Sequence, residues 1–172
     1  KIGMEYESSV AHLVDRVSVF FGEEGARLGY FADEKDKQAF IDELRYLQIN
    51  RMAAFNSPVY FNAGLYEVYG VEGSPGINYF RDPKTGEIKL IKDGGNIRPQ
   101  NHACFIKAPR DNLASILNHV VDEGITFSSG SGIGGDIGAL REEGALLSSG
   151  GKASGPMSFF GVYDDEAGTI KS

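Results

Sequence analysis

The chain has 172 residues, enough for one domain with a buried core, and its hydrophobic content of 41% is ordinary for a globular protein. A formal charge of −7 argues against binding along a nucleic-acid backbone, which needs clustered lysines and arginines, but it is compatible with binding a single nucleotide. No apolar run approaches the roughly 18 residues of a membrane span, so no membrane association is predicted. Cys104 is the only cysteine, which excludes an internal disulfide and predicts a reducing, cytoplasmic location.

Two helices are predicted in the first third of the chain. Apolar residues at helical spacing predict the first over residues 4–22. Asp33 is a favoured N-terminal cap for the second, whose apolar stripe runs from Phe40 to Phe55. This stripe stops at Ser57-Pro58, because proline disfavours helix in the residue before it.

The middle of the chain is predicted to alternate loops with short strands. Residues 65–76 contain glycine and proline and are expected to form a loop. Residues 77–91 have the pattern of a β-hairpin with a turn over residues 82–86. Residues 103–107 are predicted to be a short strand.

The last third is predicted to contain two more helices. One follows Asp111, whose carboxylate is a favoured cap for the amides of a first turn. Glycines concentrate between residues 128 and 155, where loops should dominate. Pro156 suits the first turn of a last helix, whose buried side would carry Phe159, Phe160 and Tyr163. Helices that alternate with short strands indicate an α/β or α+β class.

Two glycine-rich segments invite nucleotide-binding interpretations that their context does not support. Gly130-x-Gly132-x-x-Gly135 matches a dinucleotide fingerprint, but a helical pattern precedes it and no good helix start follows. These glycines instead suit a backbone pressed close to a ligand or to another loop. The segment around Lys152 fails as a P-loop, because Leu146 replaces the first glycine and Ala153 replaces the hydroxyl residue. Lys152 is either a phosphate contact or a solvated loop lysine.

The order and spacing of four segments resemble the catalytic chain of ribonucleotide reductases, and most closely the adenosylcobalamin-dependent class II. These segments are residues 56–64, 100–106, 130–135 and 148–156, and Leu140–Gly144 leads into the last of them. The resemblance implies an α/β fold with an N-terminal helical region over residues 1–56. Residues 57–172 would then be the start of a ten-stranded ribonucleotide-reductase barrel, incomplete in this chain and containing substrate-contact and effector-specificity segments.

The resemblance also assigns roles to particular residues. Cys104 would be catalytic, as one of two redox cysteines that deliver two electrons to the ribose. From the residues alone, a small buried hydrophobe on a strand is the favoured interpretation of this cysteine, and only the resemblance favours the catalytic one. The substrate-binding residues implied by the resemblance are Ser57, Ala103, Cys104 and Gly132.

A second set of residues would bind a deoxynucleotide effector. It consists of Asp111, Asn112, Leu113 and Arg141. The guanidinium of Arg141 suits bidentate phosphate binding, although a salt bridge with Glu142, Glu143 or another surface acid is an open alternative. Ser148 stands near the place of a second arginine in some relatives. No metal site is predicted, since the three histidines have no ligand spacing.

For the whole enzyme, the resemblance implies an adenosylcobalamin-dependent ribonucleoside-diphosphate reductase that acts by radical chemistry. Its ligands and partners would be a ribonucleotide substrate, a deoxynucleotide effector, a thioredoxin-like reductant and a second copy in a homodimer. Most adenosylcobalamin contacts would lie outside this chain, which is expected to be a fragment that lacks the radical cysteine and is inactive alone. A diiron-type reductase subunit, a non-catalytic nucleotide-binding module and a purely structural domain are the alternatives.

Overall fold

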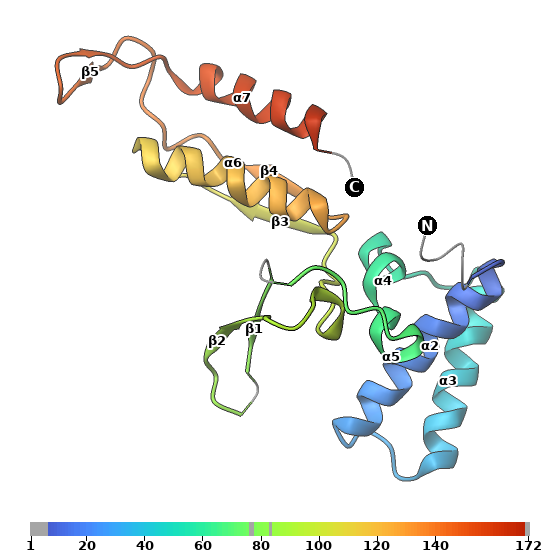
Figure 1. Cartoon of the computed structure of the whole chain (residues 1–172). Coiled ribbons are helices and arrows are strands. Elements are labelled where there is room, and N and C mark those ends of the chain that lie inside the picture. The colour runs from blue at the N-terminus through green and yellow to red at the C-terminus, as the bar shows by residue number, and fades with distance from the viewer. Residues whose placement is uncertain (1–6, 76–77, 83, 171–172) are drawn as a thin grey trace. The chain divides into compact units, whose positions relative to one another are not determined.

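The computed structural model describes residues 7–75, 78–82 and 84–170, and the chain divides into two compact units, Lys1–Asn101 and His102–Ser172. Each unit is described by itself (Figure 1). Helices and three two-stranded sheets give a mixed α/β structure, and the described part of the chain contains no closed barrel. The domain boundary expected between residues 56 and 57 falls inside the first unit and stays a prediction.

The first unit is built on two long helices that lie side by side, α2 (Val10–Arg27) and α3 (Glu34–Ile49) (Figure 1). The Ser9 side chain accepts a hydrogen bond from a first-turn amide and thereby starts α2. The prediction of a helix over 4–22 is wrong in its bounds, because the Ser9 cap delays the start and the helix continues to Arg27. Residues 4–6 of that prediction lie outside the described residues.

Helix α3 begins as predicted but ends earlier than its apolar stripe. Asp33 accepts a hydrogen bond from the Asp36 amide at 2.8 Å, which confirms the cap. The helix ends at Ile49 because Arg51 adopts a left-handed backbone with φ of 60°. Phe55 nevertheless packs on α2 from the following extended segment, with its ring centroid 4.8 Å from that of Phe21. The stripe therefore reflected burial rather than a continuous helix.

A short helix, α4 (Ser57–Asn62), begins where the sequence predicted a helix end. The Asn56 side chain accepts from the Val59 amide, and Pro58 occupies the first turn, where a missing amide costs no helical hydrogen bond. The proline therefore starts a helix here. The core of the unit forms where α4 meets α2, and its buried members are Val17, Phe20, Val59 and Ala63.

A buried arginine ties α4 to α2. Arg16 is 2% exposed, and its guanidinium donates to the carbonyl oxygens of Tyr60, at 2.7 Å, and Ala63. Its Nε atom pairs with the Glu7 carboxylate at 2.5 Å, and the Tyr69 hydroxyl donates to the same carboxylate at 3.1 Å. Because a buried charge is stable only when it is paired, this network fixes the position of the helix that carries Ser57.

The rest of the first unit contains a short helix and a hairpin. Helix α5 (Leu65–Tyr69) corrects the prediction that residues 65–76 are all loop. It fits between Gly64 and Gly70, whose left-handed backbones start and end it.

The hairpin prediction is confirmed. Strand β1 (Tyr79–Arg81) pairs antiparallel with β2 (Ile88–Leu90), and the short helix η1 (Gly95–Ile97) follows. Two residues of the prediction, Ile77 at its start and Pro83 in its turn, lie outside the described residues.

The second unit begins with a strand–helix–strand motif. Strand β3 (Cys104–Lys107) leads into α6 (Leu113–Ser128), and β4 (Gly132–Gly135) returns parallel to β3. The predicted strand and third helix are confirmed. Because the glycines of β4 form a strand that follows a helix, the rejection of a dinucleotide-binding loop is also confirmed.

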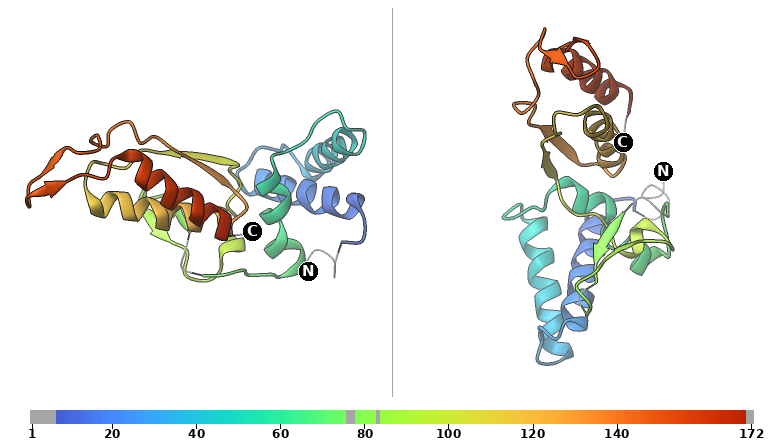
Figure 2. Two further views of the ribbon diagram at one scale, coloured as in Figure 1. Left: turned by 90° about the horizontal axis from the view of Figure 1, so that it is seen from above. Right: turned by 90° about the vertical axis from the view of Figure 1, so that its left-hand side faces the viewer.

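Two further elements complete the unit. Strands β5 (Leu146–Leu147) and β6 (Gly151–Lys152) form a small hairpin within the glycine-rich region, and α7 (Pro156–Thr169) lies along α6 (Figure 2). Tyr163 is buried as predicted, but Phe160 is 52% exposed. Phe159 and Tyr163 are one helical turn apart and face α6, whereas Phe160 lies about 100° further round the helix. None of the described helices is both long and apolar enough to cross a membrane.

Candidate functional site

The parallel pairing of β3 with β4 brings two predicted substrate contacts together. Cys104 lies opposite Gly132, and the Gly132 amide donates to the Ala103 carbonyl oxygen at 2.7 Å. Cys104 and Gly132 are 28 positions apart in the sequence, which alone does not specify the register in which the two strands pair. The structure therefore places Cys104 and Gly132 on one sheet, with Ala103 hydrogen-bonded to Gly132 directly before β3.

The surroundings of Cys104 fit an accessible thiol better than a core residue. Its side chain is exposed, which removes the interpretation of Cys104 as a buried hydrophobe within this chain. A Cβ atom added at Gly132 would contact only the Ala103 oxygen, at 3.8 Å. The contacts described within the chain therefore do not require glycine at this position, and the space beside the thiol is open to another molecule.

The start of β4 is anchored to the segment just before the cysteine. The Ser131 hydroxyl is buried and donates to the His102 carbonyl oxygen at 2.7 Å. The His102 ring meets Phe105 edge-on, with centroids 6.0 Å apart. These contacts fix the backbone on both sides of Cys104. The role of Ser131 was not predicted, because a serine within a glycine run carries no distinguishing pattern.

Ser57 belongs to a different unit from this group. It is the first residue of α4 in the first unit, and its side chain is exposed. The other predicted substrate contacts belong to the second unit. Its substrate role stays a prediction.

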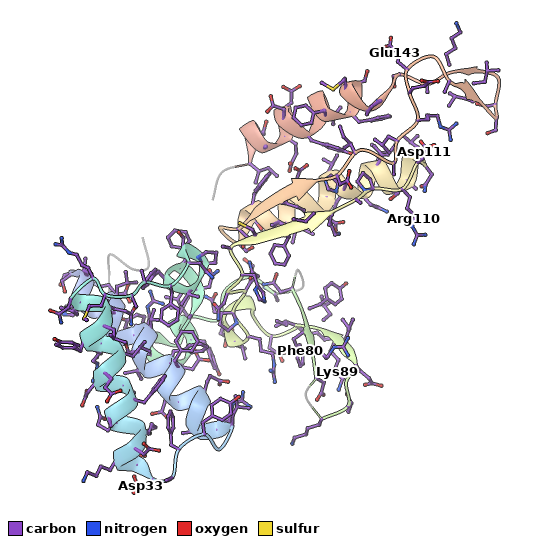
Figure 3. The ribbon with its side chains drawn as sticks, turned by 180° about the vertical axis from the view of Figure 1, so that it is seen from behind. Asp33, Phe80, Lys89, Arg110, Asp111 and Glu143 are labelled. Carbon is purple, nitrogen blue, oxygen red and sulfur yellow. The ribbon has the colours of Figure 1, made fainter. Side chains whose placement is uncertain are left out.

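The predicted effector residues Asp111 and Arg141 contact one another. Asp111 accepts from the Arg141 Nε atom at 2.8 Å and from the Arg141 backbone amide at 3.4 Å. The expected cap role of Asp111 is wrong, because the Asn112 side chain caps α6 by accepting from the Ser115 amide at 2.9 Å. The ion pair joins the β3–α6 connection to the loop after β4, and Figure 3 shows Asp111 at that end of the unit.

The salt-bridge alternative for Arg141 is therefore realised with Asp111, and neither Glu142 nor Glu143 is the acid involved. Both side chains of the pair remain more than a third exposed, at 39% and 35%. An exposed pair of this kind contributes little to stability, so its partners can exchange for a ligand. A guanidinium that already faces an oxyanion is correctly oriented for a phosphate.

Leu113 differs from the other effector candidates in chemistry. It is the first residue of α6, and its apolar side chain is 62% exposed. It begins a stripe of exposed apolar residues at intervals of four along the helix: Leu113, Leu117, Val121 and Ile125. This spacing places the stripe on one face of α6, away from the buried Ile116.

A set of buried polar groups between α6 and α7 was not predicted. His119 is 3% exposed, packs edge-on against Tyr163 at 4.8 Å, and its Nε2 atom has no hydrogen-bond partner. One turn later, Glu123 also has an unpaired buried oxygen. Burial raises the pKa of Glu123 above its usual range, and the charge of Glu166 on α7 raises it further.

These groups do not amount to a metal centre. Burial, and secondarily the charge of Lys107, lower the pKa of His119 and favour its neutral ring. No group of three or more histidine, cysteine or acidic side chains gathers in a metal-binding arrangement among the residues with a described position. The sequence signal for this set is a histidine and a glutamate at i and i+4 on the apolar face of a helix.

Comparison with known proteins covers both units. The family described as class II vitamin B12-dependent ribonucleotide reductase matches residues 2–51, which include α2 and α3. The family described as ribonucleotide reductase, barrel domain, matches residues 102–172, which is the second unit.

Individual relatives match almost the whole chain. The vitamin B12-dependent ribonucleotide reductase of Bradyrhizobium diazoefficiens is 42% identical to this chain, over 96% of the chain and 13% of the relative. The corresponding protein of Rhodopirellula baltica is 39% identical, over 98% of this chain and 16% of the relative. The corresponding protein of Agrobacterium fabrum is 40% identical, over 96% of this chain and 13% of the relative. The chain therefore spans less than a fifth of the length of these relatives.

Proposed function

The chain belongs to the class II vitamin B12-dependent ribonucleotide reductase family, as an N-terminal portion, and we propose that it supplies part of that reductase's substrate and effector sites. The observation that carries the proposal is the β3–β4 pairing, which sets the exposed Cys104 thiol opposite Gly132. The names of the relatives favour the B12-dependent class over the diiron class.

In this proposal, Cys104 is one half of the reducing pair. Replacing the ribose 2′-hydroxyl by hydrogen consumes two electrons and releases water, and two thiols supply these electrons by forming one disulfide. Cys104 is the only cysteine here, so its partner comes from the remainder of the protein. An external dithiol of the thioredoxin type would then reduce the disulfide. Ser57, Ala103 and Gly132 would bind and orient the ribonucleotide beside the thiol.

Adenosylcobalamin, when bound, would supply the radical that starts the reaction. The one buried imidazole among the described residues, that of His119, packs against Tyr163 and closely approaches Gly135, so it does not face an open site for the corrin. No described side chain is therefore assigned to the cofactor. That its contacts lie mostly outside this chain stays a prediction.

We propose the Asp111–Arg141 pair as the centre of a deoxynucleotide effector site. Its support is geometric: an exposed guanidinium held in place by a carboxylate, next to the N-terminus of a 16-residue helix. Helix N-termini and arginine forks both favour phosphate. Asn112 and Leu113 form the start of that helix and would line the site.

A homodimer through α6 and α7 belongs to the same proposal. The apolar stripe of α6 is exposed, and α7 adds Met157 at 72% and Phe160 at 52% exposure. An unpaired apolar stripe of this kind is typical of a helix that packs on another subunit. In such a dimer, Phe160, which the sequence wrongly predicted to face the core, would pack on the second copy.

The test is ribonucleotide reduction by the full-length protein with adenosylcobalamin and a dithiol, with each deoxynucleotide in turn. The Cys104→Ser variant should lose multiple turnover with the dithiol while it retains deoxynucleotide binding. Turnover at the parental rate would refute the role of Cys104. If the relative rates for substrates with different bases do not change with the added deoxynucleotide, the effector site is refuted.

A further inference from the structure

The hairpin of the first unit carries a basic pocket that the proposed function does not use. Residues 78–98 contain five lysines and arginines against three acids, in a chain with a net charge of −7. Beside the hairpin lies a pocket of about 470 Å³, whose lining includes Phe80, Lys89, Ile91, Lys92, Ile97 and Arg98. Pockets of this volume are large enough for a small organic ligand.

One wall of the pocket alternates aromatic and cationic groups. The Arg98 guanidinium carbon lies 4.1 Å from the centre of the Phe80 ring. Phe80 stands directly opposite Lys89 in the β1–β2 ladder, and both side chains are labelled in Figure 3. A guanidinium stacked on a ring keeps its N–H edge free for an oxyanion, since stacking uses only its face.

The charges of the pocket are not balanced from within. Lys89 pairs with Asp82 at 2.6 Å, and this hydrogen bond lowers the pKa of Asp82 to about 2. Over the part of the chain with described positions, neither Lys92 nor Arg98 forms an ion pair. Asp93 is the only acid in the lining. Two cations beside one aromatic ring thus remain available to an anion.

We propose that this pocket binds a nucleoside phosphate. The phosphate would contact Lys92 and Arg98, and the base would lie against the Phe80–Arg98 stack. Inorganic phosphate needs only the cations, whereas the ring of Phe80 and the apolar floor of Ile91 and Ile97 give a planar base a surface to contact. This site lies in the first unit and shares no residue with Asp111 and Arg141 of the second.

Photolabelling of the full-length protein with 8-azido-ATP, followed by mass spectrometry of the labelled peptides, tests the proposal. We expect label within residues 79–98, and competition by ATP at lower concentration than by inorganic triphosphate. The double variant Lys92→Gln/Arg98→Gln should reduce this labelling by roughly tenfold or more, because it removes hydrogen bonds from charged donors. Lys84→Gln, in the turn of the same hairpin and outside the pocket, is the matched control and should leave labelling unchanged.

Phe80→Leu keeps both cations and removes the aromatic surface, so it should weaken competition by ATP but not by triphosphate. Label found only outside residues 79–98, or unaffected by the double substitution, would overturn the proposal. Equal competition by ATP and triphosphate would show an anion site without a nucleoside preference and would also overturn it. Circular dichroism of each variant separates loss of the ligand site from loss of the fold.

Discussion

Replacing Arg16 by methionine tests whether the buried network holds α4, and with it Ser57, in place. Methionine retains much of the apolar stem, so the main loss is the charge and its hydrogen bonds. The substitution leaves the Glu7 carboxylate, which is only 9% exposed, without its cation, and frees two carbonyl oxygens. Breaking one half of a buried ion pair costs about 3–5 kcal/mol. We expect a local loss of that size.

Hydrogen exchange of the full-length protein measures this loss where it should occur. Amides of residues 57–63 should exchange faster by about two to four orders of magnitude in Arg16→Met. Arg27→Met is the matched control, because Arg27 pairs with Glu24 on the surface of the same helix and should leave exchange almost unchanged. Adding Glu7→Gln to Arg16→Met should recover part of the loss, since no buried charge then remains. Equal effects of Arg16→Met and Arg27→Met would refute a positioning role for the network.

Two further substitutions probe the packing of α6. Because the pKa of Glu123 is raised in the folded chain, its stabilising contribution is present below the usual glutamate pKa, near 4.5, and is lost as pH rises through the folded value. Glu123→Gln should therefore raise the thermal unfolding midpoint more at pH 8 than at pH 5. Equal shifts at both pH values would contradict this linkage. Gly135→Ala would place a Cβ atom 2.9 Å from His119 Nε2, so we expect it to lower the thermal unfolding midpoint. Gly161 is a helical glycine whose added Cβ would have nothing within 4 Å, so Gly161→Ala should raise the midpoint slightly. The contact with His119 is unimportant if both variants move the midpoint in the same direction.

Much of the local structure could be predicted from the sequence, and the failures have specific causes. The Asp33 cap, the hairpin and the strand at Cys104 were predictable because each depends on neighbouring residues. The end of α3 was not, because Phe55 continues the apolar pattern from outside the helix and packs on α2. The spacing of apolar residues marks which residues are buried, and it indicates a helix only where the backbone is helical.

The candidate site shows the same division between local and tertiary information. Cys104 and Gly132 could be proposed from motif order, but their register required the pairing of β3 with β4. Asp111 was a reasonable cap on local grounds, since both it and Asn112 are favoured there. Asn112 takes the cap, and Asp111 is thereby free to pair with Arg141, 30 residues away. No local pattern distinguishes these two outcomes.

In the proposed effector site, the Asp111–Arg141 contact would give a physical route by which a bound effector influences the proposed substrate site. Asp111 follows the end of β3 and Arg141 follows the end of β4. Cys104 and Gly132 are the first residues of these two parallel strands, so they lie at the other end of the sheet. A nucleotide phosphate that binds Arg141 competes with Asp111 for the same guanidinium. Releasing the carboxylate loosens the connection between the two loops, while the strands remain joined by their ladder. A ligand can shift a substrate site only through such a differential contact, and this ion pair is the contact that the effector would replace.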